Sequence, residues 1–282
     1  MKLLLTGKEV AQQINEKNIA IVQRLKAQGK DVTLAIVRIG EDASDIQYES
    51  SAIKKCNDSD VKVKSVVLTS DISEEEYLKE IDKLNADNNI DGILLLRPLP
   101  KHINDKRVRD RLVVNKDVDG CCDESLAGIF TNNKDCFAPC TAQAVIEMLN
   151  YYHIDVCGKK VVVVGRSLVI GKPVAMLLLA LNATVTIAHS KSTDLQEIVK
   201  NADIVITSVG KAEMFDGSYF RTGQVVIDVG VNYSESKQKM VGDVDFDTVS
   251  NVVDMISPVP RGVGSITTSV LINHVCLAAE RK

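Results

Sequence analysis

The sequence predicts an α/β protein of two domains, with mostly parallel sheets and helices on both faces of each sheet. Three observations carry this prediction. The chain has 282 residues, and domains are typically about 100–200 residues long. Short apolar runs typical of buried strands alternate with segments of helical periodicity. After Thr141 the alternation starts again, which predicts a second, Rossmann-like doubly wound domain.

The first half is expected to contain three strands that alternate with helices. The stretch "KEVAQQINEKNIAIVQRLKAQ" places its apolar residues on one helical face, and Gly29 ends the predicted helix. Strands are expected at "VTLAIVRIG", "VKVKSVVLTS" and "IDGILLLRPLP". Helices are expected at "ASDIQYESSAIKKC" and "EEEYLKEIDKLNAD", and Ser73 with Glu76 predicts a capping box for the second of them.

The second half is expected to repeat the pattern, with Thr193 and Gln196 capping the helix that follows them. Its other elements are a helix over 141–153, a strand over 161–164, a helix over 171–181, and strands over 183–188, 202–209 and 224–229. Prolines mark the junctions, which predicts a first domain over 1–138 and a second over 139–264. The last helix, within 265–282, is expected to complete the first domain.

The composition excludes several classes of function. A net charge of −4 and a charged content of 26% are ordinary for a globular protein, so neither a nucleic-acid nor a membrane partner is expected. No apolar segment has the length of a signal peptide core or a membrane span. Seven cysteines without a C-x-x-C pair indicate free thiols in the cytoplasm. Cys136 and Cys140 lack a nearby histidine pair, so no metal site is expected.

The stretch "VVVVGRSLVIGKPVAMLLL" predicts a strand, a glycine turn and a helix. Gly165 and Gly171 bracket the turn, but the central glycine of the G-x-G-x-x-G fingerprint is absent. Pro173 suits a first helical turn, whose free N–H groups attract phosphate. A plain strand-to-helix corner is the alternative interpretation, and this segment alone leaves both open.

The end of the following strand favours NADP over NAD. An NAD site usually carries Asp or Glu about 20 residues after the glycine turn, where it binds the ribose hydroxyls. Here "ATVTIAHSKS" carries no carboxylate, and Ser190 with Arg166 suits a 2′-phosphate. An ordinary solvated strand end is the alternative for His189 and Lys191.

Several motifs together resemble the methylenetetrahydrofolate dehydrogenase/methenyltetrahydrofolate cyclohydrolase family. They are, in order, "DGILLLRPLP", "NKDVDG", "PCTAQAV", "VVVVGRSLVIGKPVA", "ATVTIAHSKS", "VVIDVGVN" and "SPVPRGVGSITTSVL". The resemblance implies an N-terminal folate-binding domain, a C-terminal NADP-binding domain, folate in the cleft between them and a homodimer. It also implies oxidation of 5,10-methylenetetrahydrofolate, followed by hydrolysis of the methenyl product to 10-formyltetrahydrofolate.

The resemblance also assigns site residues by position. Tyr48 and Asp119 are the two expected in catalysis: Tyr48 stacks on the folate ring, and Asp119 binds the pterin. The other expected folate contacts are Leu96, Pro98 and Gly262. The expected NADP contacts are Gly165, Arg166, Ser167, Gly171, Pro173, Ser190 and Val231.

The chain departs from the family where the hydrolase step is carried out. The family's helix reads Y-x-x-x-K, and its strand ends in Q-L-P-L-P. Here Ala52 replaces the lysine and Leu96 replaces the glutamine. Hydride transfer needs positioning, whereas hydrolysis needs acid–base groups. The sequence therefore predicts that the cyclohydrolase activity is weak or lost, with Lys55, about 10 Å along the helix from Tyr48, as the alternative base.

Two other functions remain open from the residues. One is an NADP-linked dehydrogenase that acts on a different small molecule. The other is a folate- or nucleotide-binding protein without catalysis. Tyr48 and Asp119 favour folate over the first alternative, and the intact "GRS" turn favours catalysis over the second.

The loop "PRGVG" places Arg261 where the family has glycine. The backbone conformation of Arg261 therefore tests whether the loop keeps the family's shape.

Overall fold

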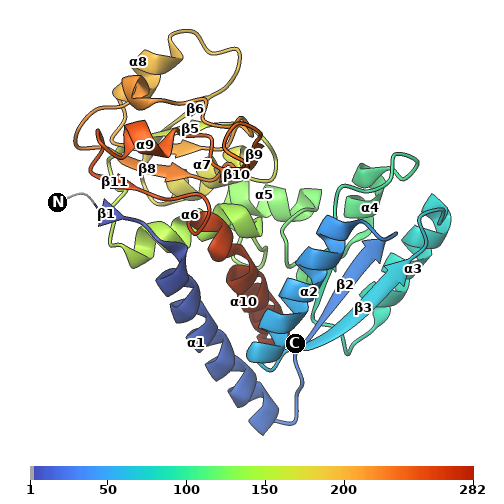
Figure 1. Ribbon diagram of the computed structural model, residues 1–282. Helices are drawn as coiled ribbons and strands as arrows, with labels where there is room; N and C mark the ends of the chain where they lie inside the picture. Colours follow the sequence, from blue (N-terminus) through green and yellow to red (C-terminus); the bar gives the residue numbers. More distant parts are fainter. Residues whose placement is uncertain (1–2) are drawn as a thin grey trace. The chain divides into compact units, whose positions relative to one another are not determined.

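The computed structural model describes residues 3–282, which form two compact units (Figure 1). The six-stranded unit contains residues 3–12 and Thr141–Thr267. The three-stranded unit contains Gln13–Cys140 and Thr268–Lys282. The predicted α/β class with parallel sheets is confirmed, since every pair of neighbouring strands in both main sheets is parallel. No helix within residues 3–282 is both long and apolar enough to cross a membrane.

The three-stranded unit is built on a parallel sheet of order β3-β2-β4. Its strands are β2 (Thr33–Ile39), β3 (Lys62–Leu68) and β4 (Gly92–Leu95). Its helices are α2 (Ala43–Asp58), α3 (Glu74–Ala86), α4 (Asp105–Arg111), α5 (Asp123–Thr131) and most of α1 (Gly7–Ala27) and α10 (Thr267–Glu280), with the 3-10 turn η1 (Val114–Lys116). The predicted capping box of α3 is present: the Ser73 and Glu76 side chains each bond the other's backbone.

Helices cover both faces of this sheet. On one face, Tyr77 and Ile81 of α3 and Val108 of α4 pack against alternate residues of β2 and β4. On the other face α10 approaches β4 so closely that a Cβ at Gly92 would lie 3.1 Å from Val275. The last helix is thus part of the core of this unit, because it fills the face that α3 and α4 leave open.

The six-stranded unit contains a parallel sheet of order β1-β11-β8-β7-β5-β6. Its strands are β1 (Leu3–Leu4), β5 (Lys160–Val164), β6 (Thr184–Ala188), β7 (Ile204–Thr207), β8 (Val225–Asp228) and β11 (Met255–Ile256). A separate antiparallel hairpin joins β9 (Asn232–Ser234) and β10 (Lys239–Val241). The unit's helices are α6 (Cys140–Tyr151), α7 (Gly171–Ala180), α8 (Leu195–Lys200) and α9 (Phe246–Val249).

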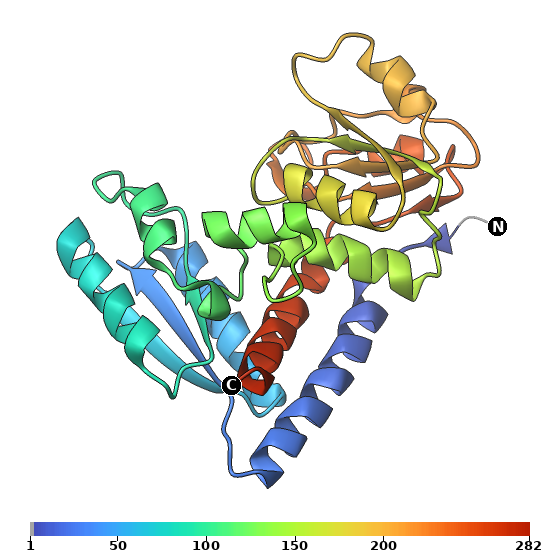
Figure 2. The ribbon, with the colours of Figure 1, turned by 180° about the vertical axis from the view of Figure 1, so that it is seen from behind.

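The strand order gives this sheet a topological switch point between β5 and β7. From β5 onward the order is that of a doubly wound 2-1-3-4-5 fold, in which the chain crosses to opposite sides of the first strand. α8 and α9 pack on one face through Val199 and Val249, and α7 lies on the other face (Figure 2). Ligands of such folds bind outside the carboxyl ends of the strands at this switch point.

Two details differ from the sequence predictions. The expected cap of α8 by Thr193 and Gln196 is wrong: Asp194 precedes the helix in a left-handed conformation, and no side chain caps it. The Gln196 amide donates to the Ser218 carbonyl oxygen at 2.8 Å. Because this side chain bonds a distant residue, it does not cap the helix. In addition, β1 pairs with β11, which places residues 3–12 in the six-stranded unit, whereas the predicted boundary kept them with residues 13–138.

Candidate active site

The turn between β5 and α7 has two positions that only glycine can occupy. Gly165 has φ of +138°, and a Cβ there would overlap the Ser208 side chain at the end of β7. A Cβ at Gly171 would overlap the Gly165 carbonyl oxygen. The two glycines therefore let the start of α7 lie directly against the end of β5. This is the switch point, so the first N–H groups of α7 point to where a dinucleotide phosphate would bind.

Side chains around this turn are free to bind an anion. Arg166, Ser167 and Ser190 are exposed. The Ser167 hydroxyl accepts the Ile170 N–H at 3.1 Å, which closes the turn. Within residues 3–282 no side-chain hydrogen bond or ion pair occupies Arg166 or Ser190. Pro173 is buried in the first turn of α7, where its missing N–H costs nothing.

The last expected cofactor contact, Val231, lies on the loop after β8. Its side chain is 58% exposed, which is unusual for a valine in this unit. Gly165, Ser190 and Val231 thus follow β5, β6 and β8, and all three lie at the carboxyl edge of the same sheet. The sequence located each of these residues but did not show that their strands are neighbours.

In the three-stranded unit, the segment "NKDVDG" connects several helices. The Lys116 ammonium donates to the carbonyl oxygens of Leu84, Asn85 and Asp87 at 2.7–2.9 Å, so it binds the end of α3. Asp117 is fully buried and accepts the Cys122 N–H at 2.9 Å, just before α5. These bonds fix the backbone of the segment on both sides of Asp119.

Gly120 completes this segment. Its φ is +63°, and a Cβ would lie 2.5 Å from the Phe137 carbonyl oxygen. Only glycine fits both conditions. The tight turn therefore positions Asp119 by backbone geometry.

Asp119 lies in a cluster with Tyr48, Cys140 and Thr268. The Cys140 thiol and N–H lie beside the Asp119 carboxylate and lower its pKa, while the thiol donates to the Val118 carbonyl oxygen at 3.4 Å. The Tyr48 hydroxyl lies near Thr268, which lowers the Tyr48 pKa, and the residue remains 42% exposed. Burial raises the pKa of Asp119 to about 6, and burial also raises the pKa of the Tyr48 phenol above its usual range. The cluster thus presents one exposed aromatic ring beside one carboxylate of raised pKa.

A buried ion pair holds the helix that carries Tyr48. The Arg38 Nε donates to the Glu49 carboxylate at 2.7 Å, and both side chains are about nine-tenths buried or more. Ser65 of β3 donates to the same carboxylate, and Arg38 also donates to the Gly40 carbonyl oxygen. Because Glu49 follows Tyr48 directly, this network fixes the rotation of α2 over the sheet.

The two family departures lie in the same unit. Ala52 is 1% exposed on the inner face of α2, and Leu96 is 8% exposed just after β4. Arg97 is turned to Asp105, with its Nε and Nη2 each 2.7 Å from a carboxylate oxygen. Lys55 is half-buried, and burial lowers the pKa of its ammonium group.

The structure thus brings Tyr48 and Asp119 together and places Leu96 and the exposed Pro98 after β4 of the same unit. Gly262 lies in the six-stranded unit, where a Cβ would overlap the Pro258 carbonyl oxygen. The sequence did not connect Cys140 or Thr268 with this cluster, although both stand within the quoted motifs "PCTAQAV" and "SPVPRGVGSITTSVL".

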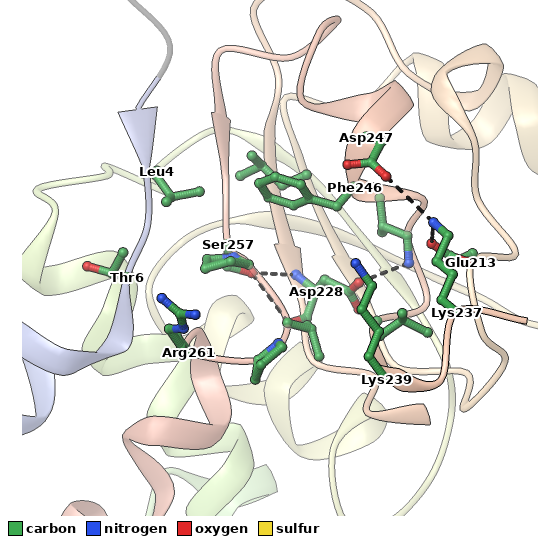
Figure 3. Close-up of a pocket in the computed structure, with 17 residues that line it drawn as sticks. Leu4, Thr6, Glu213, Asp228, Lys237, Lys239, Phe246, Asp247, Ser257 and Arg261 are labelled. Atoms are coloured by element: carbon green, nitrogen blue, oxygen red, sulfur yellow. Dashed lines mark hydrogen bonds and ion pairs between the residues drawn. The ribbon is translucent and has the colours of Figure 1, made fainter. Parts of the chain in front are cut away.

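The loop containing Arg261 borders a cavity of about 280 Å³ at the ends of β8 and β11 (Figure 3). Arg261 keeps a left-handed φ of +78°, so the loop retains a glycine-like conformation at the expense of backbone strain. Phe246 and Ile256 contribute apolar wall, and Lys237 pairs with Glu213 at the rim. Of the described residues expected to bind cofactor, none lines this cavity.

Comparisons with known proteins cover both units. Residues 5–119 match the family model "Tetrahydrofolate dehydrogenase/cyclohydrolase, catalytic domain", and residues 139–282 match "Tetrahydrofolate dehydrogenase/cyclohydrolase, NAD(P)-binding domain". The "Bifunctional protein FolD" of Clostridium botulinum strain Langeland is 46% identical over 100% of this chain and 99% of its own.

Two solved structures are similar over the whole chain. The bifunctional FolD enzyme of Campylobacter jejuni has a TM-score of 0.97 at 34% identity, over 100% of this chain and 99% of its own. The methylenetetrahydrofolate dehydrogenase-cyclohydrolase of Trypanosoma brucei, solved with NADP cofactor and an inhibitor, has a TM-score of 0.92 at 30% identity, over 99% and 98%.

Proposed function

The chain belongs to the tetrahydrofolate dehydrogenase/cyclohydrolase family, and from this premise we propose that the Tyr48–Asp119 cluster binds the folate while the Gly165–Gly171 turn binds the cofactor. The protein is an NADP-dependent methylenetetrahydrofolate dehydrogenase. The observation that carries the site assignment is the pair of glycines where any Cβ would collide, beside an unpaired Arg166 at the switch point. That arrangement suits a dinucleotide phosphate.

The dehydrogenase step requires the chain to position two molecules, the folate substrate and NADP. NADP held at the Gly165–Gly171 turn would supply the hydride acceptor for the methylene carbon, and the two folate nitrogens would stabilise the resulting cation. No side chain has to take a proton in this step. Tyr48 presents a ring face for stacking, and Asp119 accepts N–H groups of the pterin when ionised. The Cys140 thiol and N–H lie beside the Asp119 carboxylate and lower its pKa, which favours the ionised form that makes this contact.

The direct test is reduction of NADP on addition of 5,10-methylenetetrahydrofolate, followed by the absorbance of the reduced nicotinamide. Reduction with methylenetetrahydrofolate supports the proposal. Reduction with another small molecule only would favour a different dehydrogenase. Binding of both ligands without turnover would favour a non-catalytic binding protein.

Arg166→Ala is expected to weaken NADP binding about ten- to a hundredfold. Arg166 is exposed, unpaired and next to a strand end without a carboxylate, so it suits the 2′-phosphate. Charged hydrogen bonds contribute about 1.5–3 kcal/mol, which converts to that range. Calorimetric titration with NADP and NAD measures the effect. Lys159→Ala, at the opposite end of β5, is the control and should change neither affinity; equal use of NAD and NADP by the native protein would contradict the proposal.

The specificity constant for methylenetetrahydrofolate is expected to fall on acidification below about pH 6. Burial raises the pKa of Asp119 to about 6, so the carboxylate that accepts the pterin N–H groups is ionised above this pH and protonated below it. One protonation predicts about a tenfold loss in kcat/KM per pH unit on the acid side. Asp119→Asn should give a low value at every pH and no such step. A native profile that is flat down to pH 5 would show that Asp119 does not bind the pterin as an anion.

We also propose that the protein forms a homodimer in the cytoplasm. The family resemblance supports the dimer, and its molar mass in solution by light scattering tests it. All seven cysteines are free, which fits a reducing compartment.

A further inference from the structure

Two buried carboxylates join three loops at the carboxyl edge of the six-stranded sheet. Asp228 ends β8 and is 3% exposed, and Asp243 precedes α9 and is 0% exposed. Neither residue is assigned a contact with folate or cofactor above. The loops that they join follow β7, follow β8 and precede α9.

Asp228 accepts four hydrogen bonds from these loops. Its Oδ1 accepts the Thr207 hydroxyl at 3.0 Å, and the N–H groups of Gly230 and Asp243 at 3.1 Å each. Its Oδ2 accepts the Val244 N–H at 2.9 Å. The Asp228 N–H donates to the Ser257 hydroxyl at 2.8 Å (Figure 3). The donors come from three segments of the edge, at Thr207, Gly230 and 243–244, so the carboxylate links these segments.

Asp243 accepts three further hydrogen bonds. The Val209 N–H reaches Oδ2 at 2.5 Å, and the Lys211 N–H reaches Oδ1 at 2.9 Å. The Asn232 side-chain amide donates to Oδ1 at 3.0 Å. Both residues that flank Val231 are therefore bound to a carboxylate, Gly230 to Asp228 and Asn232 to Asp243.

Two positions of the chain accept only glycine because these carboxylates lie against them. A Cβ at Gly230 would overlap the Asp243 carboxylate, and a Cβ at Gly242 would overlap the Asp228 carboxylate. Burial and the nearby Asp243 carboxylate together raise the pKa of Asp228 to about 7, although its hydrogen-bond donors oppose the shift. Burying two carboxylates so close together costs folding free energy. The hydrogen-bond donors offset this cost, and the two glycines leave room for the carboxylates.

The direction of the dinucleotide follows from the strand order, and this step rests on the function proposed above. With the phosphates at the α7 N-terminus after β5 and the 2′-phosphate near Ser190 after β6, the adenosine half lies on the β6 side. The nicotinamide half must then extend to the other side, over the ends of β7 and β8. This is the edge that Asp228 and Asp243 organise.

We propose that Asp228 and Asp243 are positioning residues that hold the Val231 loop against the nicotinamide half of the cofactor. They touch no reacting atom. They act by presenting Val231 as an exposed apolar contact on a rigid backbone, and by fixing the adjoining 209–211 loop.

Asp243→Asn is the main test. The amide oxygen can keep the two donors at Oδ1, but the amide NH₂ would face the Val209 N–H, so one bond becomes a donor–donor clash. The expected result is an increase of about ten- to a hundredfold in the KM for NADP, with a smaller change in the KM for methylenetetrahydrofolate. Affinity for 2′,5′-ADP, which carries only the adenosine half, should stay within about twofold of the native value.

Two companion variants keep the test decisive. Asn232→Ala removes one donor to Asp243 but no carboxylate, and should raise the KM for NADP about five- to tenfold. This variant carries the test if Asp243→Asn does not fold. Asp247→Asn is the matched control, because that carboxylate is 78% exposed and, among residues 3–282, pairs only with Lys237, at 3.6 Å. It should leave every constant unchanged.

The possible failures are distinguishable. Equal loss of 2′,5′-ADP and NADP affinity in folded Asp243→Asn and Asn232→Ala would mean that the pair supports the whole unit, and would overturn the positioning role. Unchanged NADP constants in both variants would overturn it as well. A native protein that binds neither NADP nor 2′,5′-ADP would instead contradict the function on which the proposal rests.

Discussion

The native protein is expected to convert methylene- to methenyltetrahydrofolate but to hydrolyse the methenyl product little faster than buffer does. Ala52 and Leu96 occupy the positions of the family's lysine and glutamine, and both are buried and apolar. General acid–base groups typically contribute about 10²–10⁴-fold, so a loss of that size is expected in the hydrolase step alone. The decay of the methenyl absorbance, corrected for the spontaneous rate, measures it.

Restoring the pair should reveal that its members act together. Ala52→Lys alone should help little, because Leu96 offers no partner to orient the amine in an apolar surrounding. Leu96→Gln alone should not help at all. The double variant should recover more than the two single changes combined. The NADP-linked oxidation rate of each variant is the control, since it reports whether a lysine at the buried position 52 leaves the site intact.

Lys55 is the specific alternative. Burial lowers the pKa of its ammonium group, which is the direction that favours a general base, and Lys55 lies on the same helix as Tyr48. Fast hydrolysis by the native protein that disappears in Lys55→Met would assign the acid–base role to this residue. Lys54→Met is the matched control, because Lys54 is exposed on the same helix. That result would overturn the prediction of a lost activity.

Removal of residues 268–282 is expected to abolish folding of the three-stranded unit while the six-stranded unit still binds NADP. Ten residues of α10 are buried. Large apolar side chains contribute about 1.5–3 kcal/mol each when fully buried, so several of them equal the 5–15 kcal/mol that stabilises a typical domain. The helix also holds the segment beside Asp119, since the His274 Nδ1–H donates to the Val118 carbonyl oxygen at 2.8 Å.

Hydrogen exchange and calorimetry test this division of the chain. Amides of β2 and β4 should exchange freely in the shortened protein, and those of β5 and β7 should stay protected. NADP affinity should remain, and folate affinity should be lost. A chain that ends at residue 280 is the control and should keep both units. Retained folate binding after removal of 268–282 would show that α10 is dispensable for the three-stranded unit.

The sequence by itself determined the features that depend on neighbouring residues. Apolar spacing located the long helices and most strands, because a helix or strand buries one face at a fixed period. The Ser73–Glu76 box was readable because both bonds lie within one turn. The Gly165–Gly171 turn was also recognisable. The segment alone did not distinguish a cofactor site from a plain strand-to-helix corner, and the rest of the chain was needed for that.

Only the tertiary structure decided the features that depend on distant segments. The cluster of Tyr48, Asp119, Cys140 and Thr268 draws on α2, a turn and the starts of two other helices, and no spacing in the sequence brings these together. The same holds for Asp228 and Asp243, and for β1 beside β11. The physical reason is that periodicity and turn geometry are local, whereas burial, desolvation and the pairing of buried charges arise only when remote parts of the chain exclude water from one another.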